Sequence, residues 1–528
     1  MASEQFQFLV PEGADLKSLQ SKLQTALGLS EASSRVLERT YYDTFDWLLN
    51  HDGTVLEQIS CDGESKLMWR SFNDVRARAS EIITATPKFA HDLPTGRLRN
   101  ELERILEIRA FLPQVNVRTQ VRTFGLLNKD KKTILRLAIE QHAVKSSKRS
   151  RPRQLGIWIQ VLPVKGYDKP ANRAVSFLTH EMGLEVVSED LMLVALAAES
   201  RQPEYYSSKL KLHLEPDMRT DAAVRAILSR LHEIIEINEE GTRKDIDSEF
   251  LHDFRVAVRK TRSALTQVKG VFPQRVLDKY RTGFAWLGSV TGPTRDMDVY
   301  LLNFDHYRLS LPESVQDKLG PLHDFLIAHQ KKEQAILAKI LNSAKYKNLM
   351  KSWQAVLQSP LPARSTLPNA TRPVIVVADE RIMKAYNRVI KEGLAITPES
   401  HAERLHDLRK SCKKLRYLME FFQSLYPAEK ITALIGVLKS LQENLGDFQD
   451  FEVQATNLKS FSHQMIDEGE VPPEALMAMG VLVDGLENRQ HQAREEFAKR
   501  FTKFALAKNQ DRFHELFRVP DANRETTQ

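Results

Sequence analysis

Cysteine is nearly absent from this sequence. Its 528 residues include two cysteines, Cys61 and Cys412, and they form neither a C-x-x-C motif nor another spacing typical of metal ligands. This scarcity argues against a disulfide framework and a cysteine-based metal site. It fits a protein of a reducing compartment, so we expect a cytoplasmic location.

Long apolar runs are missing as well. No apolar segment is long enough to span a bilayer. The opening residues, MASEQFQFLVPEG, have neither a basic n-region nor an apolar h-region. We therefore expect neither a transmembrane helix nor a secretory signal.

Charge is abundant and slightly unbalanced. The chain has 76 Lys and Arg residues against 69 Asp and Glu residues, a formal net charge of +7. This favours an anionic partner, namely nucleic acid, an acidic membrane or another polyanion. The alternative is an ordinary protein with a mildly basic surface.

Two kinds of pattern divide the chain. Up to about residue 200, short β-rich segments such as TILRLAIEQHAV and GIWIQVLPVKG alternate with capped helices, one of which stops at Gly183. This half predicts an α+β domain with an antiparallel sheet, residues 1–200, in which the basic stretch 145–153 is a loop. Residues 205–515 are helical nearly throughout, and 516–528 predict a flexible tail.

The helical half contains an internal duplication. LHDFRVAVRKTR starts at Leu251 and LHDLRKSCKKLR at Leu405, and later landmarks keep the same offset of 154 residues (405 − 251 = 154). We place the copies at about 220–345 and 375–500, joined by a Pro-rich linker or insertion at 355–375. Two copies are too few for a solenoid, so a pair facing each other across a pseudo-two-fold axis is expected.

The first helix of the helical half is predicted from TDAAVRAILSRLHEIIEINEEG. It should open with Thr220 or Asp221 as its cap and close on Gly241.

Each repeated phrase is amphipathic when placed on a helix. The polar stripes are His252, Arg255, Arg259 and Arg262, and His406, Arg409, Lys413 and Arg416, widened by Lys260, Lys410 and Lys414. The adjacent apolar stripes are Phe254, Val258, Leu265 and Val268, and Leu408, Cys412, Leu415 and Met419.

The cations of the two stripes have no expected acidic partner at i,i+4, and arginine suits phosphate oxygens. The pair of stripes therefore predicts a cationic trough for a linear polyanion. A solvated helix face is the alternative. The histidines are either phosphate donors or hydrogen-bonded residues at helix starts.

A second repeated block follows each stripe. TGPTRDMDVYL and LGDFQDFEVQA place a glycine and an acidic pair, Asp296 and Asp298 in the first copy, ahead of an expected new helix. The acids would cap that helix or pair with the arginine stripe. We expect no metal site here and no catalytic residue.

These phrases resemble the signature of the conserved histidine α-helical domain, CHAD. The resemblance covers residues 205–515 and rests on LHDFRVAVRKTR, TRDMDV and LHDLRKSCKKLRY. It implies two pseudo-symmetric four-helix halves and non-enzymatic binding of inorganic polyphosphate, with a place on polyphosphate-rich granules. The implied binding positions are Arg255, Arg259, Lys260, Arg262, Arg409, Lys413, Lys414 and Arg416, with Arg230 and Lys384 on the preceding helices.

In bacteria CHAD often follows a CYTH domain, the triphosphate tunnel fold, and RTYYDTFDWLLNHDGTVLEQ resembles part of that family. Departures are severe: Glu57 and Gln58 stand where arginines belong, and Gln160 and Leu162 replace the acids that hold metal. We therefore expect a degenerate tunnel with no cofactor and no turnover. Triphosphatase activity is one alternative function. Non-specific nucleic-acid binding is another, although Tyr417 is the only obvious aromatic residue beside a stripe.

Overall fold

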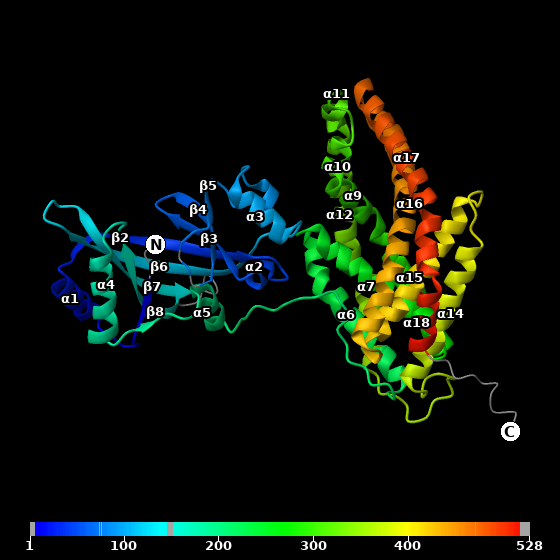
Figure 1. Cartoon of the computed structure of the whole chain (residues 1–528), viewed down its shortest axis with the longest axis horizontal. Coiled ribbons are helices and arrows are strands. Elements are labelled where there is room, and N and C mark those ends of the chain that lie inside the picture. Colours follow the sequence, from blue (N-terminus) through cyan, green and yellow to red (C-terminus); the bar gives the residue numbers. More distant parts are fainter. Residues whose placement is uncertain (1–5, 73, 75, 145–151, 470, 518–528) are drawn as a thin grey trace. The chain divides into compact units, whose positions relative to one another are not determined.

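The computed structural model describes residues 6–72, 74, 76–144, 152–469 and 471–517. The chain forms two compact units, residues 1–207 and 208–528 (Figure 1). The fold class predicted from the sequence, an antiparallel sheet followed by an all-helical part, is confirmed. Residues 145–151 of the predicted loop 145–153 and residues 518–528 of the predicted tail 516–528 lie outside the described residues. The described ends of both predictions are wrong, because Arg153 begins a strand, Leu516 ends a helix and Phe517 is 1% exposed. Within the described part, no helix combines the length and apolarity needed to cross a membrane.

A single antiparallel sheet organises the N-terminal unit. Its strand order is β5-β4-β3-β2-β6-β7-β8-β1-β9, and every described strand pair is antiparallel. The strands are β1 Phe6–Val10, β2 Ser30–Asp43, β3 Thr54–Cys61, β4 Glu64–Ser71, β5 Ala79–Ile83, β6 Leu112–Leu127, β7 Thr133–Val144, β8 Arg153–Pro163 and β9 Glu185–Val186. The segments TILRLAIEQHAV and GIWIQVLPVKG thus form β7 and most of β8, as predicted.

Short helices complete this unit. They are α1 Leu16–Leu27, α2 Leu48–His51, α3 Arg97–Leu106, α4 Asp168–Ser176, extended by the π-helical turn Phe177–Glu181, and α5 Leu191–Ala198. The Asp15 carboxylate accepts from the backbone N–H groups of Lys17 and Ser18 and caps α1. Gly183 has φ +64° and ends the segment that begins with α4, as the sequence predicted.

The C-terminal unit is built from helices. They are α6 Thr220–Lys244, α7 Ser248–Gln267, α8 Gln274–Val290, α9 Gly292–Leu302, α10 Phe304–Leu309, α11 Glu313–Gln316, α12 Gly320–Asn342, α13 Ala344–Gln358, α14 Val374–Leu394, α15 Ala402–Phe422, α16 Ala428–Glu468, α17 Pro473–Phe504 and α18 Ala507–Leu516. The proline-containing connection between the copies therefore lies between the end of α13 and the start of α14.

Helix boundaries repeat with the sequence offset. The starts of α6, α7 and α8 lie 154 residues before those of α14, α15 and α16. The copies differ after that point, because α8 and α9 are separated at Thr291 whereas α16 continues unbroken. Helix α7 of the first copy packs against α15 of the second. The two motif helices are therefore direct neighbours.

The expected cap and stop of α6 are wrong. Thr220 is the first helical residue, and its hydroxyl donates to the Arg372 carbonyl at 2.8 Å instead of capping the helix. Gly241 lies within α6, which ends at Lys244. A glycine is needed there because an added Cβ would lie 2.2 Å from Cδ1 of Phe250 on α7.

The acidic pair of the second block is also placed differently from the prediction. Asp296 and Asp298 lie inside α9, which has already begun at Gly292. In the second copy, Gly446 lies in the interior of α16, so no new helix starts after it. A long helix continues through the glycine because neighbouring helices stabilise it more than one glycine destabilises it.

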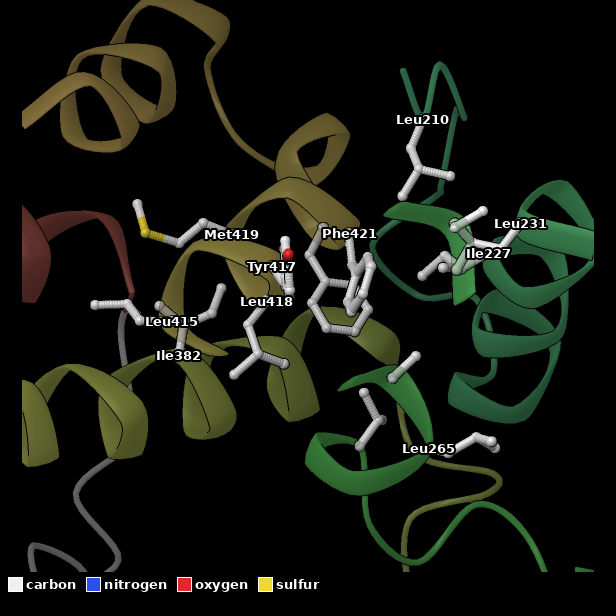
Figure 2. Packing of buried hydrophobic residues seen from close by; sticks show 14 of the residues in the cluster. Leu210, Ile227, Leu231, Leu265, Ile382, Leu415, Tyr417, Leu418, Met419 and Phe421 are labelled. Carbon is white, nitrogen blue, oxygen red and sulfur yellow. The ribbon is translucent and has the colours of Figure 1, made fainter. Parts of the chain in front are cut away.

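One apolar core joins the two copies. All eight residues of the predicted apolar stripes are at most 2% exposed, so that prediction is confirmed. Figure 2 shows Leu415, Leu418 and Met419 of α15 in this core, together with Leu265 from α7. This packing fixes the rotation of both motif helices, and the polar stripes must then lie away from the core.

The close contact at Gly241 predicts a stability difference between two Gly-to-Ala variants. Gly241→Ala should lower the free energy of unfolding by roughly 1–3 kcal/mol, because the methyl group overpacks against Phe250. Gly436→Ala is the control: it is exposed on α16, and a Cβ there meets no atom within 4 Å. It should stabilise the protein by roughly 0.5–1 kcal/mol. Thermal or urea unfolding measures both, and equal effects would contradict the packing argument.

Candidate anion-binding site

The two motif histidines join each motif helix to a later helix of the same copy, α7 to α9 and α15 to α16. His252 Nδ1 accepts from the Arg295 guanidinium at 2.9 Å. His406 Nδ1 bonds to Oε1 of Gln449, which occupies the position 154 residues after Arg295. The bonds join equivalent positions in the two copies, although His252 Nδ1 accepts and His406 Nδ1 donates. This shared pairing supports the anchoring role that the sequence left open.

The first cationic stripe lies along α7 beside α8. Arg255 donates through Nη1 to the Gly288 carbonyl at 3.0 Å and to Thr291 Oγ1 at 2.8 Å. Burial lowers the pKa of Arg255 to about 10, an effect that Asp296 partly offsets. Arg259 and Arg262 are exposed further along the helix. This stripe therefore has one anchored arginine and two that are accessible.

The second stripe, on α15, is more enclosed. Arg409, Lys413 and Arg416 are each half-buried. Burial, together with the nearby charges of Arg409 and Arg259, lowers the pKa of Lys413 to about 8. Arg259 belongs to the first copy and is the duplicate of Lys413. The two stripes thus converge where these equivalent residues meet, and we call the combined surface the trough.

Carboxylates neutralise part of the trough, contrary to the prediction that its cations lack acidic partners. Glu420 lies 3.4 Å from Arg416 Nε on the same helix, at i,i+4, and 2.9 Å from Lys260 Nζ of the first copy. Asp450 accepts from Arg409 at 2.8 Å. The acidic residue of the second block therefore pairs with the stripe, which is one of the two roles expected for it. Glu420 reduces the positive charge at the Arg416 end of the second stripe, but it does not pair with Lys413 at the centre.

The remaining predicted positions lie outside the trough. Arg230 on α6 donates to Glu233 at 3.0 Å, and Lys410 pairs with Asp407 at 3.1 Å. Lys384 and Lys414 line a separate pocket of about 370 Å³, which we call the Lys384 pocket.

The Lys384 pocket holds cations that the sequence analysis missed. They are Lys269, Arg281, Arg381 and Arg388. The last two follow the spacing of Lys384 on α14, at i−3 and i+4, so a helical-face search beyond the repeated phrases would have found them.

One group of side chains has the geometry of a cation site within the described residues. Ligand atoms of Glu249, His252 and Asp253 all lie within 4.8 Å of one another. The Arg295 guanidinium stands 2.9 Å from the His252 ring and opposes a divalent cation there. We assign the group to anchoring the start of α7.

The N-terminal unit has a partly open cavity of about 470 Å³. Glu57 projects into it and pairs with Arg39 and Arg70, each at 3.1 Å, while Arg70 also pairs with Asp190. Burial opposes ionisation of Glu57, but the two arginines outweigh it and hold its pKa below the ordinary value. The arginines of the cavity are therefore already neutralised by carboxylates of the same unit.

The two positions where acids were expected do face this cavity. Gln160 and Leu162 both line it. The cavity nevertheless has a buried carboxylate, Glu140, whose pKa is raised by burial and which lies 3.9 Å from Arg39. Gln58 points elsewhere and accepts from Tyr42 and Thr86. Sequence reasoning missed Glu140 and Asp190, because their distance along the chain hides their approach to Glu57 and Arg39.

The predicted CHAD domain is confirmed: residues 226–459 match the model of the CHAD domain family. No curated protein matches the chain. Among solved structures, the CHAD domain of the plant Ricinus communis is 25% identical, covers 56% of this chain and 95% of its own, and has a TM-score of 0.46. PptA from Streptomyces chartreusis is 16% identical over 54% of this chain and 100% of its own, with a TM-score of 0.43.

The N-terminal region also has solved structures similar to it. A Hippeastrum protein described as an adenylyl cyclase with a dominant triphosphatase activity is 14% identical. It covers 38% of this chain and 99% of its own, with a TM-score of 0.28. The similarity that the sequence led us to expect for this region is thus found as a similarity of fold.

The enclosed Lys413 predicts a stability effect that depends on pH. Its pKa is about 8 in the folded chain and about 10.5 when unfolded, so its charge destabilises the fold fully below pH 8. Between these values the unfolded chain binds more protons, so stability rises with pH. Lys413→Gln should therefore stabilise the ligand-free protein at pH 7, by at most about 3 kcal/mol.

The gain from Lys413→Gln should shrink as the pH rises from 8 towards 10.5. Lys410→Gln is the control, because Lys410 is exposed and paired with Asp407, and its effect should be within about 1 kcal/mol. Unfolding curves across this pH range give both values. A destabilised Lys413→Gln at pH 7 would contradict the electrostatic account.

Proposed function

We propose that the helical unit binds inorganic polyphosphate along the trough. The observation that carries the proposal is the half-buried Lys413, placed among Arg409, Arg416 and Arg259 of the other copy. Charges of one sign that are held together without enough counter-charge favour a ligand with closely spaced negative groups. The resemblance to CHAD, confirmed for residues 226–459, supports this class of ligand. Placement of the protein on polyphosphate-rich granules would follow from such binding and is part of the proposal.

Nucleic acid fits the trough less well. Single-stranded nucleic acids gain much of their affinity from bases stacked on exposed aromatic rings. Tyr417 is 6% exposed, and the Arg416 guanidinium lies 5.6 Å from its ring centre. The residue that the sequence offered for stacking is therefore covered. Nucleic acid is left with phosphate contacts alone, which are non-specific.

The proposal predicts the effect of reversing two charges in the trough. Arg259→Glu with Arg262→Glu should weaken long-chain polyphosphate binding by tenfold or more, because two accessible phosphate contacts become repulsive. The slope of log affinity against log salt should flatten by roughly one for each lost contact. Fluorescence or calorimetric titration at several salt concentrations measures both quantities.

A control with the same change in net charge separates a site from general attraction. Lys439→Glu with Lys459→Glu alters exposed positions on α16 that are already near Glu443 and Glu487. This control should bind within about threefold of the unaltered protein, since distant exposed charges are screened. Equal losses in the two double variants would mean that the trough is not a site.

Triphosphate hydrolysis in the N-terminal unit is the second candidate function, and the cavity lined by Arg39 and Arg70 is the observation that favours it. We expect no hydrolysis with magnesium or manganese, because Gln160 and Leu162 carry no charge and Glu57 is held by two arginines. Phosphate release from tripolyphosphate, compared with heat-inactivated protein, tests this. Metal-dependent release well above that control would establish an enzyme and reverse the assignment.

A further inference from the structure

The Lys384 pocket is a second concentration of positive charge, distinct from the trough. The first copy contributes Thr266, Gln267, Lys269 and Arg281, and the second contributes Arg381, Lys384, Ala385, Arg388, Ser411 and Lys414. None of Arg255, Arg259 and Lys413 lines it. The pocket is therefore formed by both copies, but by different side chains from those that form the trough.

Positive charge in this pocket is poorly compensated. Its lining includes six Lys or Arg residues and no carboxylate. Arg388 pairs with Glu392, a residue outside the lining. Arg381 has a buried Nε that lacks a hydrogen-bond partner among the described residues, and burial lowers its pKa. An unsatisfied buried guanidinium N–H is a donor available to an anion.

The duplication provides an internal comparison, because every lining residue has a counterpart 154 positions away. Four of the six cations have an uncharged counterpart. The pairs are Lys269 with Gln423, Arg281 with Ile435, Arg381 with Ile227, and Arg388 with Ile234. Ile227 and Ile234 are each 1% exposed. The counterpart position is therefore apolar core where the Lys384 pocket is cationic.

The two cations that are kept on the counterpart side are both neutralised. Arg230, the counterpart of Lys384, pairs with Glu233. Lys260, the counterpart of Lys414, pairs with Glu420 at 2.9 Å. The residue equivalent to Glu420 is Thr266, which lines the Lys384 pocket and brings no charge.

Apolar side chains occupy the counterpart side. Phe421 is the counterpart of Gln267 and is 2% exposed. Figure 2 shows it on the side of α15 that faces Ile227 and Leu231, with Leu210 beside them. Leu210 comes from the segment before α6. The equivalent segment before α14 contributes no residue to the lining of the Lys384 pocket. Space that is open in one half of the duplication is thus filled in the other.

We infer that the Lys384 pocket is a one-sided site for a short condensed phosphate, such as the end of a polyphosphate chain, and that its counterpart is closed. This inference rests on the proposed function and adds the position and number of the end-binding sites. Six cations around about 370 Å³ suit several phosphate groups held close together. The other half of the duplication offers no equivalent second pocket, because Phe421 and Leu210 fill that place.

Two variants at equivalent positions test the inference. Lys384→Gln removes an exposed cation of the pocket, and Arg230→Gln removes its duplicate on α6. Calorimetric titration with tripolyphosphate should give one site per chain for the unaltered protein. Lys384→Gln should weaken binding about tenfold, the loss of one charge-assisted contact. Arg230→Gln should change it less than twofold.

A third variant closes the pocket by copying its counterpart. Thr266→Glu places a carboxylate where Glu420 stands in the other half, facing Lys414 as Glu420 faces Lys260. It should abolish tripolyphosphate binding while the helical circular dichroism signal and the melting temperature stay unchanged. Thr266→Gln, of the same size and without charge, is the control and should keep binding within about threefold.

The outcomes separate this inference from the proposed function. Long-chain binding without tripolyphosphate binding, two equal sites per chain, or equal losses in Lys384→Gln and Arg230→Gln would each overturn the one-sided pocket alone. Failure of the unaltered protein to bind either long-chain polyphosphate or tripolyphosphate would overturn both.

Discussion

The main constraint on the helical unit is that the contact between α7 and α15 must hold like charges close together. Lys413 is half-buried beside arginines of both copies, and no single carboxylate neutralises the group. Such an arrangement is unfavourable for folding, so it persists only because the opposite faces of the same helices are firmly packed. Residues such as Phe254 and Leu415, fully buried in a shared core, provide that packing. Under the proposed function, this packing would favour binding, because cations that are already held in place need no reorganisation to contact an anion.

Duplication explains why charge converges at this contact, and divergence explains why it is uneven. A helix packed against its own duplicate brings equivalent residues together, as Arg259 and Lys413 show. Away from that contact the copies are free to change separately. One change, Thr266 against Glu420, decides whether a neighbouring lysine is neutralised. Another, Gln267 against Phe421, decides whether the adjoining space is filled. The two halves therefore share a fold while offering different surfaces to an anion.

The parts of this arrangement that follow from local periodicity could be predicted from sequence. The stripes, the offset of 154 residues and the buried apolar faces all depend on helical phase, which the residues specify directly. What escaped prediction depends on contacts between distant segments. Gly241 looked like a helix stop because its packing against Phe250 is invisible in sequence. Glu420 is far from Lys260 along the chain, so their ion pair could not be predicted. The cations of α14 lie outside the repeated phrases. The predicted binding residues stay predictions, since their position does not by itself prove what they bind.

In the N-terminal unit, clustered arginines are neutralised by a carboxylate of the chain itself. Its cavity also gathers arginines, but Glu57 lies between Arg39 and Arg70 and satisfies both. The Glu57 carboxylate is held 3.1 Å from each arginine, so it competes with a dissolved anion at a very high effective concentration. Protonation does not release it near neutral pH, because the arginines keep the pKa of Glu57 low. An incoming phosphate would have to displace a buried ion pair and leave a second negative charge inside the sheet. Cations in excess of carboxylates are found in the helical unit instead, so the proposed anion binding is assigned to the duplicated helices.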